Sequence, residues 1–385
     1  MLVDSYSRKV LKPWLSLWLG KENANSFVEA GLELNNRLWD MRAIAFGALL
    51  RGLSPSKRPY VQIVFNRRCN IQCPNCGVPS TAENEMSVDH WKDILTKIDE
   101  AYRPRHLGIS GGEPLLRKAE LLEIISFATN RGITTGLNTN GLRLYEDTAR
   151  ALRDAGLTTL TVSYDGIPPK NVPVVLDRAQ EASGLGIPTT VQLTLSERNI
   201  GVARSIKEDV FRRHMSFSAP LVQTVNGLFS TDIYQPPSVE DVRRFYGELL
   251  DDQRSLFEVR VRDDRNWLKF MATRYPEKWK CSGTGWVTID EGGRMMHCQE
   301  YSTPYGVDDA LGARETEFEL KRRELADACE GCQFTCYYTA DEQGRNLLPI
   351  SPIKLEVQGW QRMAAYTLDT ILEKLGGDEE TSVVE

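Results

Sequence analysis

The chain has 385 residues, of which 41% are hydrophobic and 26% are charged, and its formal net charge is −6. This balance describes an ordinary folded protein with room for one large domain and a smaller one, and the acidic excess argues against general nucleic-acid binding. No run reaches the roughly 18 apolar residues of a membrane-spanning helix, so the sequence predicts a protein of a reducing, cytoplasmic compartment with at most a peripheral membrane contact.

Apolar residues recur at helical spacing through the first fifty positions, with Trp14, Trp18 and Trp39 among them, before the helix-breaking stretch 52–56. The pattern predicts an N-terminal helical extension over residues 1–58. Tryptophans at this spacing favour packing against the main domain; a membrane-surface helix and a cap over the active site are the alternatives.

Strand and helix patterns then alternate over residues 59–225. The predicted strands are 60–65, 106–110, 133–137, 158–163, 189–195 and 216–222, and the predicted helices are 88–102, 119–130, 146–155, 174–185 and 202–214. Six successive β-α units imply parallel strands with right-handed crossovers. The sequence therefore predicts an α/β fold, a partial (β/α)6 TIM-like barrel, with its chemistry at the C-terminal ends of the strands.

A CxxxCxxC loop, formed by Cys69, Cys73 and Cys76, follows the first strand. Three thiolates leave one iron of a four-iron cluster without a protein ligand, and that iron is an open catalytic position. Disulfides, a structural zinc site and inert buried thiols are the other interpretations. A chain of this length needs no disulfide staples and begins with nothing like a secretory signal, which disfavours disulfides; zinc stays open at this point.

Small and polar residues end the next three strands. Glycines permit close approach of a ligand to the backbone, a carboxylate accepts from an ammonium group, and short polar side chains suit a ribose or a carboxylate. Each segment alone is an ordinary turn, but on consecutive strand ends beside three thiols they predict a ligand site. The residues are Gly111, Gly112, Glu113, Pro114, Asn138, Thr139, Asn140, Ser163 and Asp165.

This combination resembles the radical S-adenosylmethionine (radical SAM) enzymes over residues 59–225. The resemblance implies that Cys69, Cys73 and Cys76 hold a 4Fe-4S cluster, that the GGEP segment contacts the methionine amino group of S-adenosylmethionine, and that the two later segments face its ribose and carboxylate. It also implies a flavodoxin- or ferredoxin-type electron donor. One departure is Asn75, where the family usually has an aromatic residue.

Five further cysteines lie near the C-terminus. Alternation from Trp286 to Ile289 and a turn at 291–293 predict a β-hairpin that brings the first two of them together, and their spacing is similar to the SPASM and twitch auxiliary-cluster domains of the same family. Five thiols fit one auxiliary 4Fe-4S cluster, as in a twitch domain, better than two; a zinc ribbon is the alternative. The first choice of ligands is Cys281, Cys298, Cys329 and Cys332, with Cys336 as a near rival.

The remaining segments complete the predicted domain plan. Residues 226–280 connect the barrel to the auxiliary-cluster domain, 281–350, and residues 351–385 form a C-terminal helix and an acidic tail. Arg260, Arg262 and Arg265 lie in the connecting region, where they form either a solvated face or a clamp for a substrate carboxylate or phosphate.

The substrate is the least determined part of the prediction. The resemblance offers a small molecule or natural product, a ribosomally made peptide, or a lipid or tetrapyrrole. The first is favoured, because peptide maturases often carry a leader-binding module where this chain has only helical periodicity. A non-catalytic iron-sulfur or zinc scaffold is least favoured, since a scaffold needs no cofactor segments at its strand ends.

Overall fold

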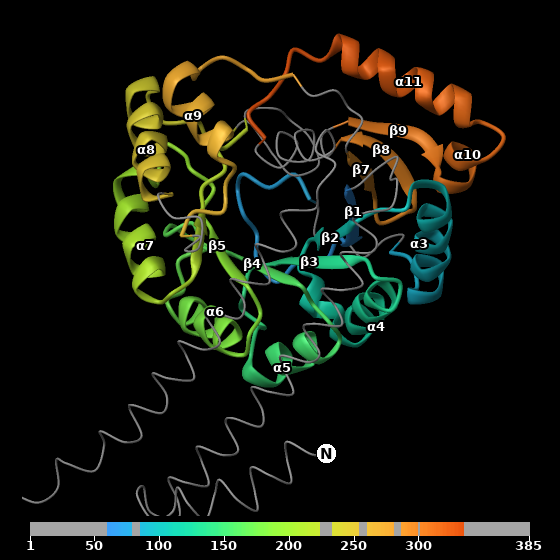
Figure 1. Ribbon diagram of the computed structural model, residues 1–385, viewed down its shortest axis with the longest axis horizontal. Coiled ribbons are helices and arrows are strands. Elements are labelled where there is room, and N and C mark those ends of the chain that lie inside the picture. The colour runs from blue at the N-terminus through green and yellow to red at the C-terminus, as the bar shows by residue number, and fades with distance from the viewer. Residues whose placement is uncertain are drawn as a thin grey trace, which may run out of the picture.

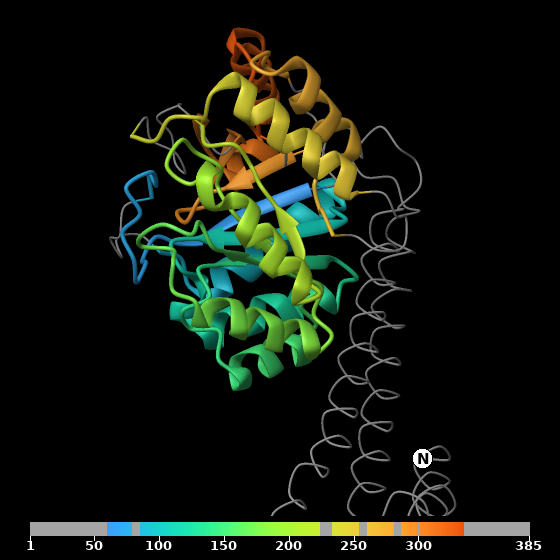
Figure 2. The same cartoon turned by 90° about the vertical axis from the view of Figure 1, so that its left-hand side faces the viewer.

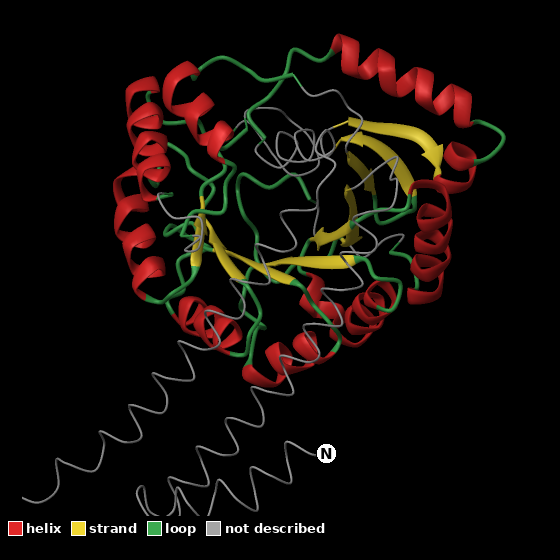
Figure 3. Cartoon of the chain, in the orientation of Figure 1, coloured by secondary structure: helices red, strands yellow, loops and turns green. Residues whose placement is uncertain are grey.

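The computed structural model describes residues 60–78, 85–223, 233–253, 260–280, 286–298 and 301–334. Its strands form one open sheet in the order β6-β5-β4-β3-β2-β1-β7-β8-β9. Helices surround the sheet on its outer side, so that the strands lie inside a ring of helices (Figures 1 and 3). The predicted α/β partial barrel is confirmed.

The barrel is built from six strands that pair in parallel with their neighbours, and each strand is followed by at least one helix. Five of these helices run back outside the sheet to the next strand. The elements are β1 (Tyr60–Asn66), α3 (Val88–Tyr102), β2 (His106–Gly111), η2 (Pro114–Arg117), α4 (Lys118–Thr129), β3 (Thr134–Thr139), α5 (Glu146–Asp154), β4 (Thr159–Ser163), α6 (Val174–Gly184), β5 (Thr189–Gln192), α7 (Ile200–Arg212) and β6 (Ser216–Ser218).

The rest of the described chain extends both ends of this sheet. Residues 260–262 lie along β6 through a parallel bridge between Phe217 and Val261. At the other end, β7 pairs in parallel with β1 and begins the antiparallel β7-β8-β9 ribbon. The elements are α8 (Val239–Asp252), α9 (Arg265–Arg274), β7 (Trp286–Ile289), β8 (Arg294–Cys298), β9 (Tyr301–Gly306), α10 (Val307–Leu311) and α11 (Glu315–Ala328).

The two faces of the barrel sheet differ in chemistry. On β1, Val61, Ile63 and Phe65 belong to the apolar core beneath the helices. Gln62 alternates with them and faces the inside of the barrel, where its amide donates to the hydroxyl of Ser110 at 3.0 Å. In-register neighbours share a face in parallel strands, so the inner face carries Gln62, Val64, Gly108, Ser110, Gly136, Asn138, Thr159, Thr161, Ser163, Thr190 and Gln192.

This inner face is unlike a packed barrel core. Barrel interiors that only stabilise the fold are filled by bulky branched side chains. Here the side chains other than Val64 are small or polar, Asn138 is exposed, and Gly108, Gly136, Ser163 and Gln192 are partly exposed. A polar, accessible interior is suited to binding a ligand.

Several expectations fall on other parts of the chain. The N-terminal helical extension 1–58, Cys281, Cys336 and the C-terminal helix and tail lie outside the described residues. Within the described ranges, no helix has the length and apolarity needed to cross a membrane.

Candidate functional site

Cys69, Cys73 and Cys76 lie in the loop that follows β1, at the C-terminal end of the barrel strands. Figure 2 shows this loop, in blue, emerging at the same end of the barrel as the loops that follow the other strands. Cys69 and Cys73 are partly exposed and Cys76 is exposed. A turn in which the Cys76 amide donates to the Cys73 carbonyl at 3.1 Å folds the loop back on itself.

The three thiols are close enough to affect one another's protonation. Burial, together with the charges of Cys76, Asp165 and Cys69, raises the pKa of Cys73 to about 11, against a lowering by Lys170. Burial also raises the pKa of Cys69, with Glu113 and Cys76 adding to it. Such thiols bind protons rather than remain thiolates, unless a metal supplies the compensating positive charge.

The donor set fits an iron-sulfur cluster. Among the described residues, no group of three or more His, Cys, Asp and Glu side chains is arranged to chelate a single metal ion. A cluster makes a different demand, because each thiolate binds an iron of its own. Three thiols on one loop, at the mouth of the barrel, fit that demand, and they would leave one iron of a four-iron cluster without a protein thiolate.

Asn140 connects the end of β3 to this loop. Its side-chain amide donates to Oδ1 of Asn70 at 2.7 Å and lies 3.9 Å from the sulfur of Cys69. Its own Oδ1 accepts from the Leu142 amide at 3.0 Å, which fixes the orientation of the side chain. An N–H group directed at a cluster sulfur stabilises the thiolate form and tunes the cluster.

Glu113 lies inside the protein, between the ends of β2 and β3. Its side chain is 0% exposed. Oε1 accepts from the Leu115 amide at 3.0 Å and from the Thr139 hydroxyl at 2.8 Å, and Oε2 accepts from the Asn140 amide at 2.8 Å. Burial raises its pKa although these hydrogen bonds oppose the shift. The carboxylate therefore joins β2 to β3 from within.

Gly111 and Gly112 allow two backbone segments to approach closely. A Cβ atom on Gly111 would lie 2.3 Å from the Asn66 carbonyl oxygen, and one on Gly112 would lie 2.2 Å from that of Arg68. The amides of Gly112 and Glu113 donate to those same carbonyls at 2.8 and 2.7 Å. The close approach is thus between the GGEP segment and the start of the cysteine loop.

Asn66, which sequence reasoning did not single out, completes this junction. Its side-chain amide donates to the carbonyls of Glu113 at 2.9 Å and Arg68 at 3.2 Å, and the residue is 0% exposed. The sequence could have indicated this role, because Asn66 ends a strand just before the cysteine loop.

A second junction joins the cysteine loop to the hairpin of β7 and β8. Arg67 Nε lies 2.5 Å from Glu291 Oε1, and Glu291 is in the turn between those strands. Glu85 accepts from the backbone amides of Arg67 and Arg68 at 3.0 and 3.1 Å. The segment before Cys69 is therefore held from both sides.

The end of β4 places Ser163 at the rim of the inner face, partly exposed, while Asp165 is 5% exposed. Asp165 Oδ1 accepts from the Thr194 amide at 2.8 Å, and Oδ2 lies 3.3 Å from Lys170 Nζ. The Asp165 carbonyl accepts from Asn199 at 3.1 Å. Asp165 therefore orders the ends of β4 and β5, and Ser163 and Asn138 are the predicted polar residues that face the barrel interior.

His106 lies at the opposite, N-terminal end of the inner face. Its Nδ1 is 2.9 Å from the Thr134 hydroxyl, which itself donates to the Arg105 carbonyl, so Nδ1 carries the proton. Burial, with a contribution from Arg262, lowers the pKa of His106 to about 4. The imidazole is therefore neutral at neutral pH.

We expect His106 to make stability depend on pH. In the unfolded chain His106 binds a proton below pH 6.5, whereas in the folded chain it does so only near pH 4. The free energy of unfolding should therefore be highest above pH 6.5 and should fall as the pH is lowered toward 4, by at most about 3 kcal/mol. Urea unfolding between pH 4 and 7 would measure this. A His106→Gln variant should show a flatter profile, and the exposed His90→Gln variant the wild-type one; parallel profiles for all three would contradict the assignment.

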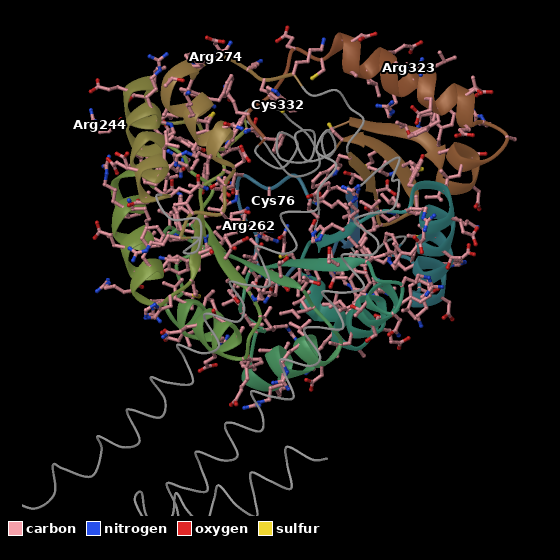
Figure 4. All side chains as sticks on the ribbon, viewed as in Figure 1. Cys76, Arg244, Arg262, Arg274, Arg323 and Cys332 are labelled. Atoms are coloured by element: carbon pink, nitrogen blue, oxygen red, sulfur yellow. The ribbon has the colours of Figure 1, made fainter. Side chains whose placement is uncertain are left out.

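Three of the rear cysteines are described. Cys298 ends β8, Cys329 ends α11, and Cys332 follows it, and all three are partly exposed. Gly331 donates its amide to the Cys329 sulfur at 3.3 Å, and Cys332 exchanges two backbone hydrogen bonds of 3.0 Å with Trp279, which precedes Cys281 by two residues. In Figure 4, Cys332 lies between α9 and α11.

Comparisons with known proteins agree with this geometry. A model of the radical SAM superfamily matches residues 63–194. The chain is 31% identical over 161 residues to a PqqA peptide cyclase of Rhodopseudomonas palustris (38% of this chain, 42% of that protein) and 29% identical over 270 residues to one of Bradyrhizobium diazoefficiens (64% and 68%). It is 34% identical over 117 residues to an Fe-coproporphyrin III synthase of Methanosarcina barkeri (30% and 29%).

Among solved structures, SuiB of Streptococcus suis bound to its precursor peptide SuiA has the same fold, with a TM-score of 0.56 at 16% identity over 72% of each chain. The alignments span less than half the length of two of the three curated relatives, at 42% and 29%. The matched region contains the cysteine loop and the ends of β1 to β4. Residues 63–194 therefore match the radical SAM superfamily.

Proposed function

We propose that this protein cleaves S-adenosylmethionine reductively and uses the product to act on a peptide. The observation that carries the proposal is the placement of three thiols and the polar strand ends at one mouth of the barrel. A cluster held by Cys69, Cys73 and Cys76 would supply one electron to S-adenosylmethionine, which yields methionine and a 5′-deoxyadenosyl radical able to take hydrogen from carbon.

The chain's own residues have three tasks in this proposal. Asn140 holds the cysteine loop and directs an N–H group at Cys69. Glu113 and Asn66 fix the distance between the GGEP segment and that loop, which orders the backbone where the cofactor would bind. Asn138 and Ser163 offer polar groups at the rim of the interior. Such preorganised positioning is what the protein contributes when a cofactor carries the chemistry.

A peptide is supported over the small molecule that the sequence alone favoured. The longer alignments are with proteins named peptide cyclases, and one of them extends over 64% of this chain, beyond the superfamily match. Among the described residues, no strand closes the sheet between residues 260–262, beside β6, and β9, and an open barrel admits an extended chain more readily than a closed one. A tetrapyrrole substrate is a second candidate, supported by the alignment to the coproporphyrin synthase.

Anaerobic reconstitution tests the first step. Reconstituted protein given dithionite and S-adenosylmethionine should produce 5′-deoxyadenosine, and absence of this product would refute the proposed activity. For the second step, peptides encoded by neighbouring genes would be deuterated and incubated with the protein. Deuterium in 5′-deoxyadenosine would identify a peptide as substrate, whereas transfer from a deuterated coproporphyrin alone would support the other candidate.

We further propose that Cys298, Cys329 and Cys332 contribute to an auxiliary 4Fe-4S cluster, with Cys281 or Cys336 as a further ligand. The amide-to-sulfur hydrogen bond at Cys329 and the pairing of Cys332 with the chain just before Cys281 support this grouping. Zinc in a ribbon-like site is the alternative.

Iron content distinguishes the two. We expect about eight irons per chain in the reconstituted protein and about four in a Cys329→Ala/Cys332→Ala double variant, because each cluster contains four. The variant should keep the barrel cluster and its absorption near 400 nm. About four irons in both proteins, with one zinc lost from the variant, would establish the zinc site instead.

A further inference from the structure

An arginine lies on the inner face of the barrel, where the other side chains are neutral. Residues 260–262 extend the sheet beside β6: the Phe217 amide donates to the Arg260 carbonyl at 2.7 Å, and the Arg262 amide donates to the Phe217 carbonyl at 2.9 Å. Val261 is 0% exposed in the core beneath the helices. Because side chains alternate along a strand, Arg262 faces the opposite, inner side.

The Arg262 side chain crosses the interior of the barrel. Its Nη1 donates to the Thr161 hydroxyl, on the inner face of β4, at 2.8 Å. β5 and β6 lie between β4 and residues 260–262 in the sheet, so the side chain spans the inner side of two strands to reach Thr161. In Figure 4, Arg262 lies inside the ring of helices, as Cys76 does.

The guanidinium is both accessible and surrounded by protein. Arg262 is exposed, yet burial lowers its pKa, against the opposing charges of Asp263 and Tyr60. These two observations agree if the solvent that Arg262 contacts is inside the barrel. The nearest carboxylate in sequence, Asp263, is occupied elsewhere, since it accepts from the Ser218 hydroxyl at 3.0 Å and from the Ala219 amide at 3.2 Å.

Within the part of the chain that the structure describes, Thr161 is the one hydrogen-bond partner of the Arg262 guanidinium. A guanidinium carries five N–H groups in a planar fork that matches a carboxylate. The inner-face groups of the neighbouring strands carry no negative charge: His106 is neutral, and Gln62, Thr159 and Thr190 are uncharged. The charge of Asp263 acts on Arg262, but the Asp263 carboxylate accepts hydrogen bonds from Ser218 and Ala219.

We infer that Arg262 binds a carboxylate of the substrate inside the barrel, and that the substrate's reacting carbon then lies above it at the cysteine-loop end. The inference rests on the proposed function for its substrate class, a peptide. Thr161 precedes the strand-end residue Ser163 by two positions, so the carboxylate site is about 7 Å below the rim. An acidic side chain or a peptide C-terminus that enters from the rim can reach that depth.

The experiment uses the reconstituted wild-type protein and phenylglyoxal, which modifies accessible guanidinium groups, with adducts located by mass spectrometry. N-acetylglutamate α-amide carries a side-chain carboxylate, N-acetylleucine a terminal one, and N-acetylglutaminamide is the neutral control. We expect Arg262 to be modified, and one or both carboxylates to slow its modification about tenfold or more. Arg265, exposed on α9, is the internal control and should be unaffected by any probe.

Variants separate binding from a structural role. Equilibrium dialysis of radiolabelled N-acetylglutamate α-amide should show affinity about tenfold to 100-fold lower in Arg262→Gln, which keeps a donor for Thr161, and much less reduced in Arg262→Lys. An unchanged affinity in Arg262→Gln, or equal protection by the neutral probe, would overturn the inference. If Arg262→Gln does not fold, the labelling of wild-type protein decides.

The outcome is separable from that of the proposed function. Formation of 5′-deoxyadenosine by wild-type protein is measured without any carboxylate probe. Protection of Arg262 without formation of 5′-deoxyadenosine would support the carboxylate site and refute the enzyme activity. Formation of 5′-deoxyadenosine without protection of Arg262 would support the enzyme activity and refute the carboxylate site.

Discussion

Replacement of Cys73 by alanine is expected to abolish the formation of 5′-deoxyadenosine. Cys73 is one of three thiols in the loop after β1, and its loss would leave a four-iron cluster with two protein ligands. Because loss of an outer hydrogen-bond partner of a metal site already costs roughly 10–100-fold in affinity or activity, loss of a ligand should cost more. Product analysis after anaerobic reconstitution and dithionite reduction measures the effect, with iron content measured in parallel.

Gln72→Ala is the matched control for Cys73→Ala. Gln72 lies between Cys69 and Cys73 in the sequence, and its side chain is exposed. This variant should therefore keep its iron and its activity. Wild-type rates in Cys73→Ala would refute the assignment of the cluster ligands. Loss of activity in both variants would instead indicate that any change in this loop disrupts it.

The sequence predicts the barrel well because its signals are local. Ser87 caps α3 through a hydrogen bond to the His90 amide, and the helix has the predicted bounds, Val88–Tyr102. Predicted strands 189–195 and 216–222 are longer than β5 and β6, because their distal parts make only one bridge, between Leu195 and Leu221. There the Thr194 amide bonds to the Asp165 side chain, 29 residues away, and such a contact has no local signal.

Helices α9 and α11 are elements that were not predicted from the sequence. No helix over residues 265–274 was predicted, although Asp264 caps α9 by accepting from the Asn266 and Trp267 amides. In α11 the buried residues are Phe318 and Arg322. Of the larger apolar residues of α11, Phe318 is buried while Leu320 is exposed. The apolar residues therefore form no clear stripe in the sequence, and burial in α11 depends on contacts that the sequence does not display.

The candidate site divides in a similar way. The identity of the thiols and of the strand-end segments is apparent from spacing, but their roles depend on contacts between distant parts of the chain. The GGEP segment packs against residues 66–68, more than 40 positions earlier, and Glu113 is enclosed by that packing. From the sequence alone, both the two glycines of the GGEP segment and Glu113 were predicted to contact a ligand. The sequence also could not show which arginine of the connecting region is positioned to bind a carboxylate. In the structure Arg262 lies on the inner face of the barrel, whereas Arg265 lies at the start of α9.

The junction at Gly112 should be the most sensitive to a single added methyl group. In Gly112→Ala, the new Cβ would lie 2.2 Å from the Arg68 carbonyl oxygen and 2.5 Å from that of Arg67. Both atoms are backbone, and the Glu113 amide donates to the Arg68 carbonyl at 2.7 Å, so neither can move without disturbing the cysteine loop. We expect a loss of about 3 kcal/mol in the free energy of unfolding, measured in urea, together with reduced iron retention.

Gly247→Ala provides the contrast, because the same chemical change meets no atom within 4 Å on helix α8. There the alanine should stabilise the protein by roughly 0.5–1 kcal/mol through its higher helix propensity, with iron content unchanged. If Gly112→Ala were as stable as wild type and kept its cluster, the GGEP segment would not hold the cysteine loop by direct backbone contact. The need for glycine at this position would then come from a bound ligand, as the sequence alone suggested.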